Sequence, residues 1–195
     1  MSKNKLICIV GMCGAGKSEV ADYMMGKRQF GYVRFGQITL DEVKRMGKKP
    51  NEALEKKIRE AFRKKHGMAA FAILNSSKFD DLLKTENVIG DGLYSWEEYA
   101  YLKDKYGDQF VCLAVYAPPG TRYRRLDGRA KKHGTDDDLR FRSFTPAEAA
   151  SRDKAEIENL NKAGPIVMAD YLILNTQSIP ALRKRVDETL EQIFD

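Results

Sequence analysis

The stretch "GMCGAGKS", from Gly11 to Ser18, decides the fold of this 195-residue chain. It matches the spacing G-x-x-x-x-G-K-[S/T], with an apolar run at 5–10 before it and a helical pattern at 17–26 after it. Its glycines can adopt backbone conformations closed to other residues, so that successive N–H groups point into one concavity. The stretch therefore predicts a phosphate-binding loop between a buried strand and a helix.

The types of residue in this loop indicate Mg-ATP as its ligand. Lys17 is expected to reach the β- and γ-phosphates and to act in catalysis, and the Ser18 hydroxyl to ligate Mg²⁺. The helix N-terminus adds a partial positive charge at the same place. A chance glycine turn is the weaker alternative, since both flanking elements are present. The loop residues expected to bind the nucleotide are Gly11, Cys13, Gly14, Ala15, Gly16, Lys17, Ser18 and Glu19.

Composition places the chain among single-domain globular proteins. Hydrophobic residues make up 43% and charged residues 32%, and no apolar stretch approaches the roughly 20 residues that span a bilayer. Its three cysteines lack metal-ligand spacing and fit free thiols in a reducing cytoplasm. The net charge of +6 implies an anionic partner, which could be a nucleic acid or a small phosphate compound.

Short apolar runs alternate with helical stretches along the chain. This alternation predicts an α/β doubly wound sheet, and strands apolar nearly throughout are typical of a parallel sheet covered on both faces. Two regions, 37–85 and 128–146, fall outside the alternation. The expected strands cover residues 5–10, 31–35, 86–91, 110–117 and 171–175.

Helix starts are marked by capping signals. Ser178 with Pro180 predicts the start of the last helix, and Pro146 suits the first position of another. Capping-box spacing occurs at Thr39 and Glu42, at Ser95 and Glu98, and at Thr145 and Glu148.

Arginines after the fourth expected strand favour a kinase over other P-loop classes. Arg122, Arg125 and Arg129 are spaced to share one helix face, and Arg152 follows across a loop. Guanidinium groups stabilise a moving phosphoryl group most in its transition state. A solvated basic face is the alternative for any single arginine. A nucleic-acid surface is less favoured because aromatic residues are sparse and three aspartates occupy 136–138.

Specific segments resemble the adenylate-kinase and dephospho-CoA-kinase branch of small P-loop kinases. Within that branch the chain is most similar to adenylate-kinase-related proteins of archaea and some bacteria. The segments run from the first expected strand to the last, so the resemblance covers nearly the whole chain. They are "IVGMCGAGKSEVADYM", "YVRFGQITLDEV", "VIGDGLYSWEEY", "AVYAPPGTRYRRL", "SRDKAEI" and "ADYLILN".

The resemblance implies a P-loop NTPase three-layer α/β/α sandwich with a five-stranded parallel sheet. It also implies a helical acceptor-binding insertion at 37–85 and an arginine-rich lid at 128–146. The core would then comprise residues 1–36, 86–127 and 147–195 of one domain. Arg129 and Arg152 would act in catalysis, and the further nucleotide contacts would be Arg125, Arg129, Asn175 and Thr176.

Asp91 is the best candidate for a second group that organises Mg²⁺. It ends the third expected strand, whereas no acid ends the fourth or fifth. It would contact Mg²⁺ through water and, with a hydroxyl acceptor, receive the proton. A turn residue in Gly-Asp-Gly is the alternative reading.

Arg34, directly after the second expected strand, bears on the acceptor. An arginine there suits the phosphate of a nucleotide, while dephospho-CoA kinases typically carry acids at that place. We therefore expect a nucleoside monophosphate acceptor, with dephospho-CoA or another small hydroxyl compound as the alternative and a nucleic-acid-associated ATPase as a weaker one. The usual arginine after "DG" is replaced here by "LYSWEE". The residues expected to bind the acceptor are Arg34, Gly36, Asp91, Gly92 and Tyr94.

Overall fold

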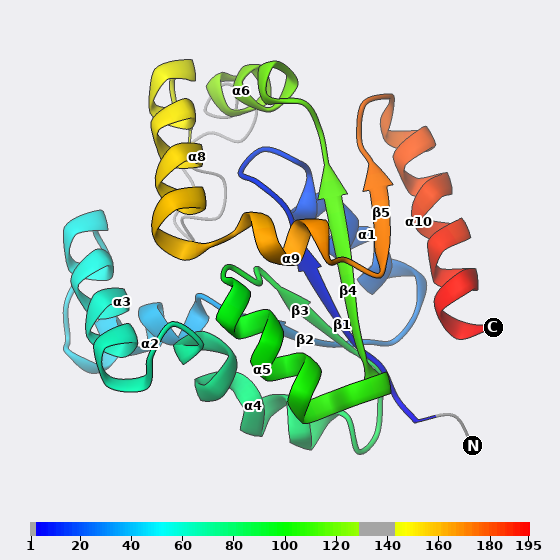
Figure 1. The fold of residues 1–195 in the computed structure, drawn as a ribbon, viewed down its shortest axis with the longest axis horizontal. Helices are drawn as coiled ribbons and strands as arrows, with labels where there is room; N and C mark the ends of the chain where they lie inside the picture. Colours follow the sequence, from blue (N-terminus) through cyan, green and yellow to red (C-terminus); the bar gives the residue numbers. More distant parts are fainter. Residues whose placement is uncertain (1–2, 129–142) are drawn as a thin grey trace.

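A single parallel sheet of five strands forms the centre of the molecule (Figure 1). The computed structural model describes residues 3–128 and 143–195. The strand order is β2-β3-β1-β4-β5, and every neighbouring pair is parallel. The predicted fold class is thus confirmed. The strands are β1 (Leu6–Val10), β2 (Gly31–Arg34), β3 (Val88–Asp91), β4 (Phe110–Tyr116) and β5 (Tyr171–Leu174).

Helices cover both faces of this sheet. In Figure 1, α1 and α10 lie against one face, while α4, α5 and α9 lie against the other. The described helices are α1 (Lys17–Lys27), α2 (Gln37–Arg45), α3 (Glu52–His66), α4 (Ala70–Leu82), α5 (Trp96–Tyr106), α6 (Pro119–Asp127), α8 (Pro146–Leu160), α9 (Ala163–Val167) and α10 (Ile179–Phe194). In the part of the chain that the structure describes, none of them is both long and apolar enough to cross a membrane.

The central strand β1 explains why the apolar runs are nearly continuous. All five of its residues are buried, and they alternate between two hydrophobic clusters. Leu6, Cys8 and Val10 pack on the α4–α5 side, whereas Ile7 and Ile9 pack on the α1–α10 side. Both faces of the strand need apolar side chains, so the period-2 alternation of a half-buried strand is absent.

Two of the three predicted capping boxes are confirmed, and the third is wrong. The side chains of Ser95 and Thr145 each accept the backbone N–H of the glutamate three residues on. The side chain of that glutamate in turn accepts the backbone N–H of Ser95 or Thr145. The helix α2 instead begins at Gln37 with Gly36 as its N-cap, so Thr39 lies inside the helix and is buried. The chain enters this helix directly in the right-handed conformation at Gly36, which leaves no cap position for Thr39.

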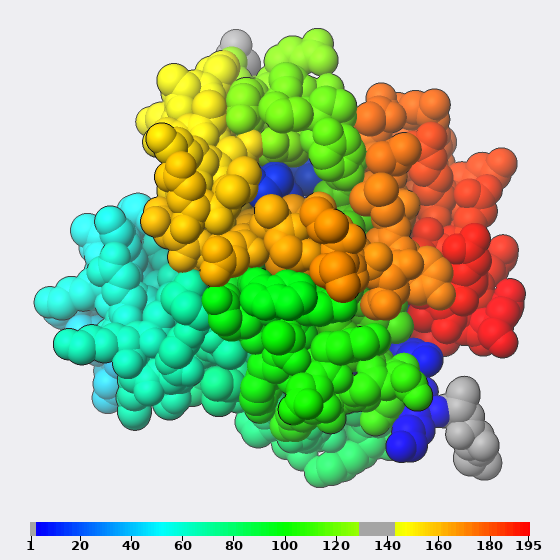
Figure 2. Space-filling view, viewed as in Figure 1, coloured from blue at the N-terminus to red at the C-terminus, as the bar shows by residue number. Residues whose placement is uncertain are grey.

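The carboxyl ends of the strands point toward the helices that frame the site. Beyond these ends lie α3, α6 and α8 (Figure 1). Figure 2 shows N-terminal atoms, in blue, at the bottom of a hollow framed by α6, α8 and α9. In open α/β sheets ligands bind outside the carboxyl ends, where the strand order reverses, and here this point lies beside β1.

Candidate active site

One cavity of about 670 Å³ gathers most of the residues that the sequence singles out. The loop after β1, the end of β2, the end of β3, α3 and α8 all contribute to its wall. Such a volume is typical of a small-molecule site. The predicted residues among its lining are Cys13, Gly14, Gly16, Lys17, Ser18, Arg34, Gly36, Asp91, Gly92, Tyr94 and Arg152.

The loop at 11–18 needs its glycines for two separate reasons. Gly11, Gly14 and Gly16 all have positive φ, a region that side chains disfavour. In addition, a Cβ on Gly14 would lie 2.8 Å from the carbonyl oxygen of Arg122, and one on Gly16 would collide with the Asn175 amide. Glycine is therefore required at these positions both for the backbone conformation and for the close contacts with Arg122 and Asn175.

Two side chains from distant parts of the chain hold this loop in shape. The Asn175 amide donates to the carbonyl oxygen of Ala15 at 2.8 Å, and Arg122 Nη1 donates to that of Cys13 at 3.0 Å. Arg122 is only 4% exposed and forms a double hydrogen bond with Asp153 of α8, at 3.0 and 2.5 Å. Of the arginines predicted to share one helix face, Arg122 therefore supports the loop from behind.

Lys17 folds back onto its own loop. Its ammonium group donates to the carbonyl oxygens of Gly11 at 2.8 Å and Met12 at 3.2 Å. Burial, and then the nearby charge of Lys162, lower the pKa of Lys17 from 10.5 to about 8. The group is thus a cation of lowered basicity whose two carbonyl partners a phosphate could replace.

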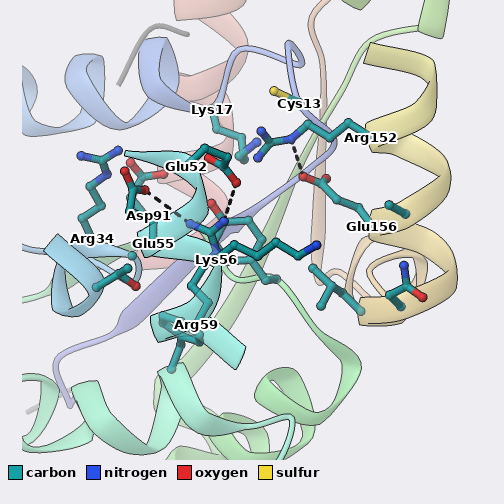
Figure 3. A pocket seen from close by; sticks show the side chains of 18 of the residues that line it. Cys13, Lys17, Arg34, Glu52, Glu55, Lys56, Arg59, Asp91, Arg152 and Glu156 are labelled. Carbon is teal, nitrogen blue, oxygen red and sulfur yellow. Dashed lines mark hydrogen bonds and ion pairs between the residues drawn. The ribbon is translucent and has the colours of Figure 1, made fainter. Parts of the chain in front are cut away.

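Asp91 and Arg34 lie side by side at the ends of β3 and β2. They are register partners, and the Asp91 backbone oxygen also accepts the N–H of Phe35 at 2.9 Å. Asp91 is only 8% exposed, and its carboxylate accepts a hydrogen bond from the Tyr32 hydroxyl at 2.6 Å. A cation and an anion are thereby fixed next to each other on the cavity wall opposite the helix α8 (Figure 3).

Ser18 and Asp91 suit Mg²⁺ in the way that nucleotide-dependent enzymes bind it. Within the described ranges, no group of three or more His, Cys, Asp or Glu side chains could hold a metal by itself. Mg²⁺ usually keeps several waters and takes one or two protein oxygens together with substrate phosphates. A hydroxyl and a carboxylate that line the same cavity match that requirement.

A chain of charged groups on α8 and beyond it reaches the same cavity. Arg152 Nε donates to Glu156 at 2.9 Å, and Lys162 Nζ donates to the other oxygen of Glu156 at 2.6 Å (Figure 3 shows the first pair). Burial alone would raise the pKa of Glu156, but the charges of Lys162 and Arg152 lower it to about 2. Lys162, 2% exposed, also lies 4.7 Å above the ring of Tyr94.

The sequence analysis does not identify Glu156 and Lys162 as residues of this site. The i, i+4 spacing of Arg152 and Glu156 could have suggested the first pair. Lys162 lies past the end of the helix, and it reaches back because Asn161 adopts the left-handed conformation, with φ 50°. Its backbone N–H bonds to the carbonyl oxygen of Glu156 at 3.3 Å, which fixes that return.

The helix α3 supplies further cavity residues that the sequence analysis did not single out. Arg59 forms ion pairs with Glu52 at 2.7 Å and Glu55 at 3.4 Å, and Lys56 lies 3.9 Å from Glu60 (Figure 3 shows the Arg59 pairs). Together with Arg63, these residues give α3 a charged inner face. In the sequence they read as an ordinary solvated helix surface.

Some of the predicted nucleotide contacts are not part of the wall of this cavity. Glu19 is paired with Arg183 at 2.9 Å on the outer side of α1, and Arg125 donates to the backbone oxygen of Asn175 at 3.0 Å. Thr176 is exposed after β5. Arg129, and most of the proposed lid at 128–146, lie outside the described residues.

Solved structures share this architecture at low sequence identity. TT1252 from Thermus thermophilus matches over 100% of both chains with a TM-score of 0.62 and 17% identity. A shikimate kinase from Bacteroides thetaiotaomicron matches over 96% of this chain and 98% of its own, with a TM-score of 0.57 and 18% identity. A gluconokinase from Sinorhizobium meliloti matches with a TM-score of 0.54 and 11% identity, over 100% of both chains. The fold is thus that of a P-loop kinase.

Sequence comparison extends this likeness to a family. Residues 7–168 match the family model described as an AAA domain. A UPF0200 protein of Thermococcus sibiricus is 31% identical over 96% of this chain and 95% of its own. Another, from Sulfurisphaera tokodaii, is 31% identical over the full length of both. With its P-loop, its five parallel strands and these full-length relatives, the chain belongs to the UPF0200 family.

Proposed function

We propose that the protein is an ATP-dependent phosphotransferase that moves the γ-phosphoryl group of Mg-ATP to a nucleoside monophosphate. One observation carries the proposal: the P-loop and the strand ends that bear Arg34 and Asp91 line the same cavity. A donor site and an anion-binding acceptor wall thereby share one space. A pure nucleotide switch would not need the second wall.

The roles of the side chains follow from their positions. The acceptor oxygen attacks the γ-phosphorus while the bond to the bridging oxygen of ADP breaks. Lys17 and Arg152 face this region with cationic groups, which stabilise the charge spread over the transferring oxygens. Ser18 and Asp91 would hold Mg²⁺, which would supply positive charge against the phosphates.

Glu156 and Lys162 prepare Arg152 for this role. Because Arg152 Nε is bonded to Glu156, the guanidinium has a fixed direction without contributing its two outer nitrogens to that bond. Figure 3 shows it beside Cys13 and Lys17. Lys162 compensates the negative charge that Glu156 would otherwise bring near the phosphates. Arg152 is thereby preorganised rather than recruited from solvent.

Arg34 favours a phosphate on the acceptor. Among the described residues none forms an ion pair with it, so its guanidinium is available for a substrate anion. Asp91 favours the second candidate, an acceptor with a hydroxyl group, because a buried carboxylate beside the cavity could receive its proton. Two neighbours in fold are named as a shikimate kinase and a gluconokinase, so such an acceptor belongs in any screen.

An ADP-release screen tests the proposal. The acceptors are ribo- and deoxynucleoside monophosphates, dephospho-CoA and small hydroxy acids, each with Mg-ATP. The Lys17→Ala variant is the blank, because it lacks the cation that reaches the phosphates. A nucleoside monophosphate that raises turnover above this blank supports the proposal, whereas stimulation by DNA or RNA alone would replace it with a nucleic-acid-dependent ATPase.

A further inference from the structure

Arg63, in the last turn of α3, is part of the cavity wall. Met68, Phe71 and Tyr94 line the same cavity. Its guanidinium lies over the ring of Phe71, 5.2 Å from the centroid. A guanidinium that stacks through its face keeps its edge free for in-plane hydrogen bonds.

The hydrogen bonding of Arg63 is incomplete. Its Nε atom is buried and has no hydrogen-bond partner within residues 3–128 and 143–195. Burial lowers the pKa of this guanidinium from its ordinary value. A buried donor without an acceptor costs free energy that a ligand oxygen can recover. The position is therefore an unusual one for a residue with no role in binding.

The carboxylates near Arg63 are already committed to other groups. Glu52 and Glu55 pair with Arg59, and Glu60 lies against Lys56. The fourth, Glu98, is buried in the capping box of α5, where one oxygen accepts the N–H groups of Tyr94 and Ser95.

Glu98 is only a weak counter-ion for Arg63. Burial raises the pKa of Glu98 to about 7, so a large share of it is neutral near that pH. The two side chains do not come within the 4.0 Å of an ion pair in the described structure. Arg63 thus lines the cavity without a carboxylate at ion-pair distance among the described residues.

We propose that Arg63 binds an anionic group of the acceptor, a phosphate or a carboxylate. This inference rests on the proposed function: with a nucleoside monophosphate the bound group is its phosphate, and with a hydroxyl acceptor it is an anionic group separate from the reacting hydroxyl. Arg34 and Arg63 line the same cavity, one from the end of β2 and the other from α3. The planar fork of an arginine matches either anion with two parallel hydrogen bonds.

NMR of the arginine side chains tests the subsite without any need for turnover. The Nε–H signal of Arg63 is assigned by its loss in Arg63→Lys, and the full chain is titrated with inorganic phosphate or with acetate. Sodium chloride at matched ionic strength is the control. We expect the signal to shift saturably with at least one anion, phosphate alone indicating a phosphate subsite and acetate a carboxylate subsite. No saturable shift with either anion overturns the proposal.

Kinetics with the acceptor found in the screen provide the second test. Arg63→Met should raise the KM for that acceptor about tenfold or more, as expected for loss of a charged hydrogen bond, with kcat and the KM for ATP unchanged. Lys64→Met, an exposed neighbour on the same helix, is the matched control and should change neither. If kcat falls and the KM for ATP rises by factors similar to the rise in the acceptor KM, the role of Arg63 is merely structural and the proposal is contradicted.

The two proposals fail in different ways. If no acceptor is turned over but the Arg63 signal still shifts saturably, the proposed kinase activity is wrong and the anion subsite stands. If an acceptor is turned over and the signal does not move, the kinase stands and the subsite is wrong.

Discussion

Lys162 and Glu156 form a buried ion pair, 2.6 Å between Nζ and Oε2, and Glu156 is part of the cavity wall. Both side chains are less than a tenth exposed, and the second oxygen of Glu156 is bonded to Arg152. The pair therefore links the end of α8 to the guanidinium that faces the P-loop. The same carboxylate thus stabilises the end of α8 and orients the Arg152 guanidinium.

Glu156→Gln should destabilise the protein strongly. It leaves the buried ammonium of Lys162 without its counter-charge, and loss of one partner from a buried pair costs about 3–5 kcal/mol. Urea denaturation measures the change in the free energy of unfolding. Glu158→Gln, which alters an exposed carboxylate on the same helix, should change it by less than about 1 kcal/mol. Equal effects of the two variants would count against the pair.

The contribution of Glu156 should also depend on pH in one direction. Its pKa is lowered to about 2 in the folded protein against an ordinary 4.5, so its stabilisation is present above about pH 4.5 and is lost as the pH falls toward 2. Denaturation of wild type and Glu156→Gln from pH 7 to pH 3 should show the difference between them shrinking. A difference that grows on acidification would contradict this sign.

ATP affinity should fall as the pH rises through about 8. Lys17 is charged below its lowered pKa and increasingly neutral above it, and only the charged form attracts phosphate. Calorimetric titration with a nonhydrolysable ATP analogue from pH 6.5 to 9.5 measures this. Lys17→Met should bind weakly and without that fall, whereas an unchanged fall in the variant would assign the titration to another group.

Asp153→Asn should weaken both the fold and nucleotide binding. The buried Arg122 loses its counter-ion, at a cost of about 3–5 kcal/mol, and Arg122 is the group that holds the carbonyl oxygen of Cys13. Thermal unfolding and ATP titration check the two effects. The adjacent exposed Lys154→Met should leave both unchanged. Full ATP affinity in a folded Asp153→Asn would show that the loop does not depend on this support.

Arg34→Met should act on the acceptor and not on ATP. Its guanidinium is on the strand edge opposite the helix α8, so its loss should raise the acceptor KM about tenfold or more while the KM for ATP stays constant. Steady-state kinetics separate the two constants. Arg45→Met, an exposed arginine on α2, provides the control. A rise in the KM for ATP alone would place Arg34 in the donor site.

The elements that the sequence predicts well are those with local causes. Each strand is an apolar run because both of its faces are covered, and the loop at 11–18 carries its own glycine pattern. The capping boxes at Ser95 and Thr145 need only residues three apart. Thr39 has the same local pattern yet lies inside a helix, so a capping pattern alone does not fix where a helix begins.

The elements that the sequence does not predict depend on distant contacts. Arg122 and Asp153 are 31 residues apart, and only the packing of α6 on α8 brings them together. Asn175, which is predicted as a nucleotide contact, donates its amide to the carbonyl oxygen of Ala15 in the loop, 160 residues away. Likewise, nothing local distinguishes Arg63 from the exposed Lys64 and Lys65 beside it.

The most direct test of the central claim is the formation of product from a nucleoside monophosphate. The protein is incubated with Mg-ATP and each monophosphate in turn, and the products are followed by phosphorus NMR. The account predicts that at least one monophosphate is converted to its diphosphate while an equal amount of ATP becomes ADP, and that Lys17→Ala forms neither. Release of inorganic phosphate without any diphosphate of the acceptor, under every acceptor tested, would contradict it.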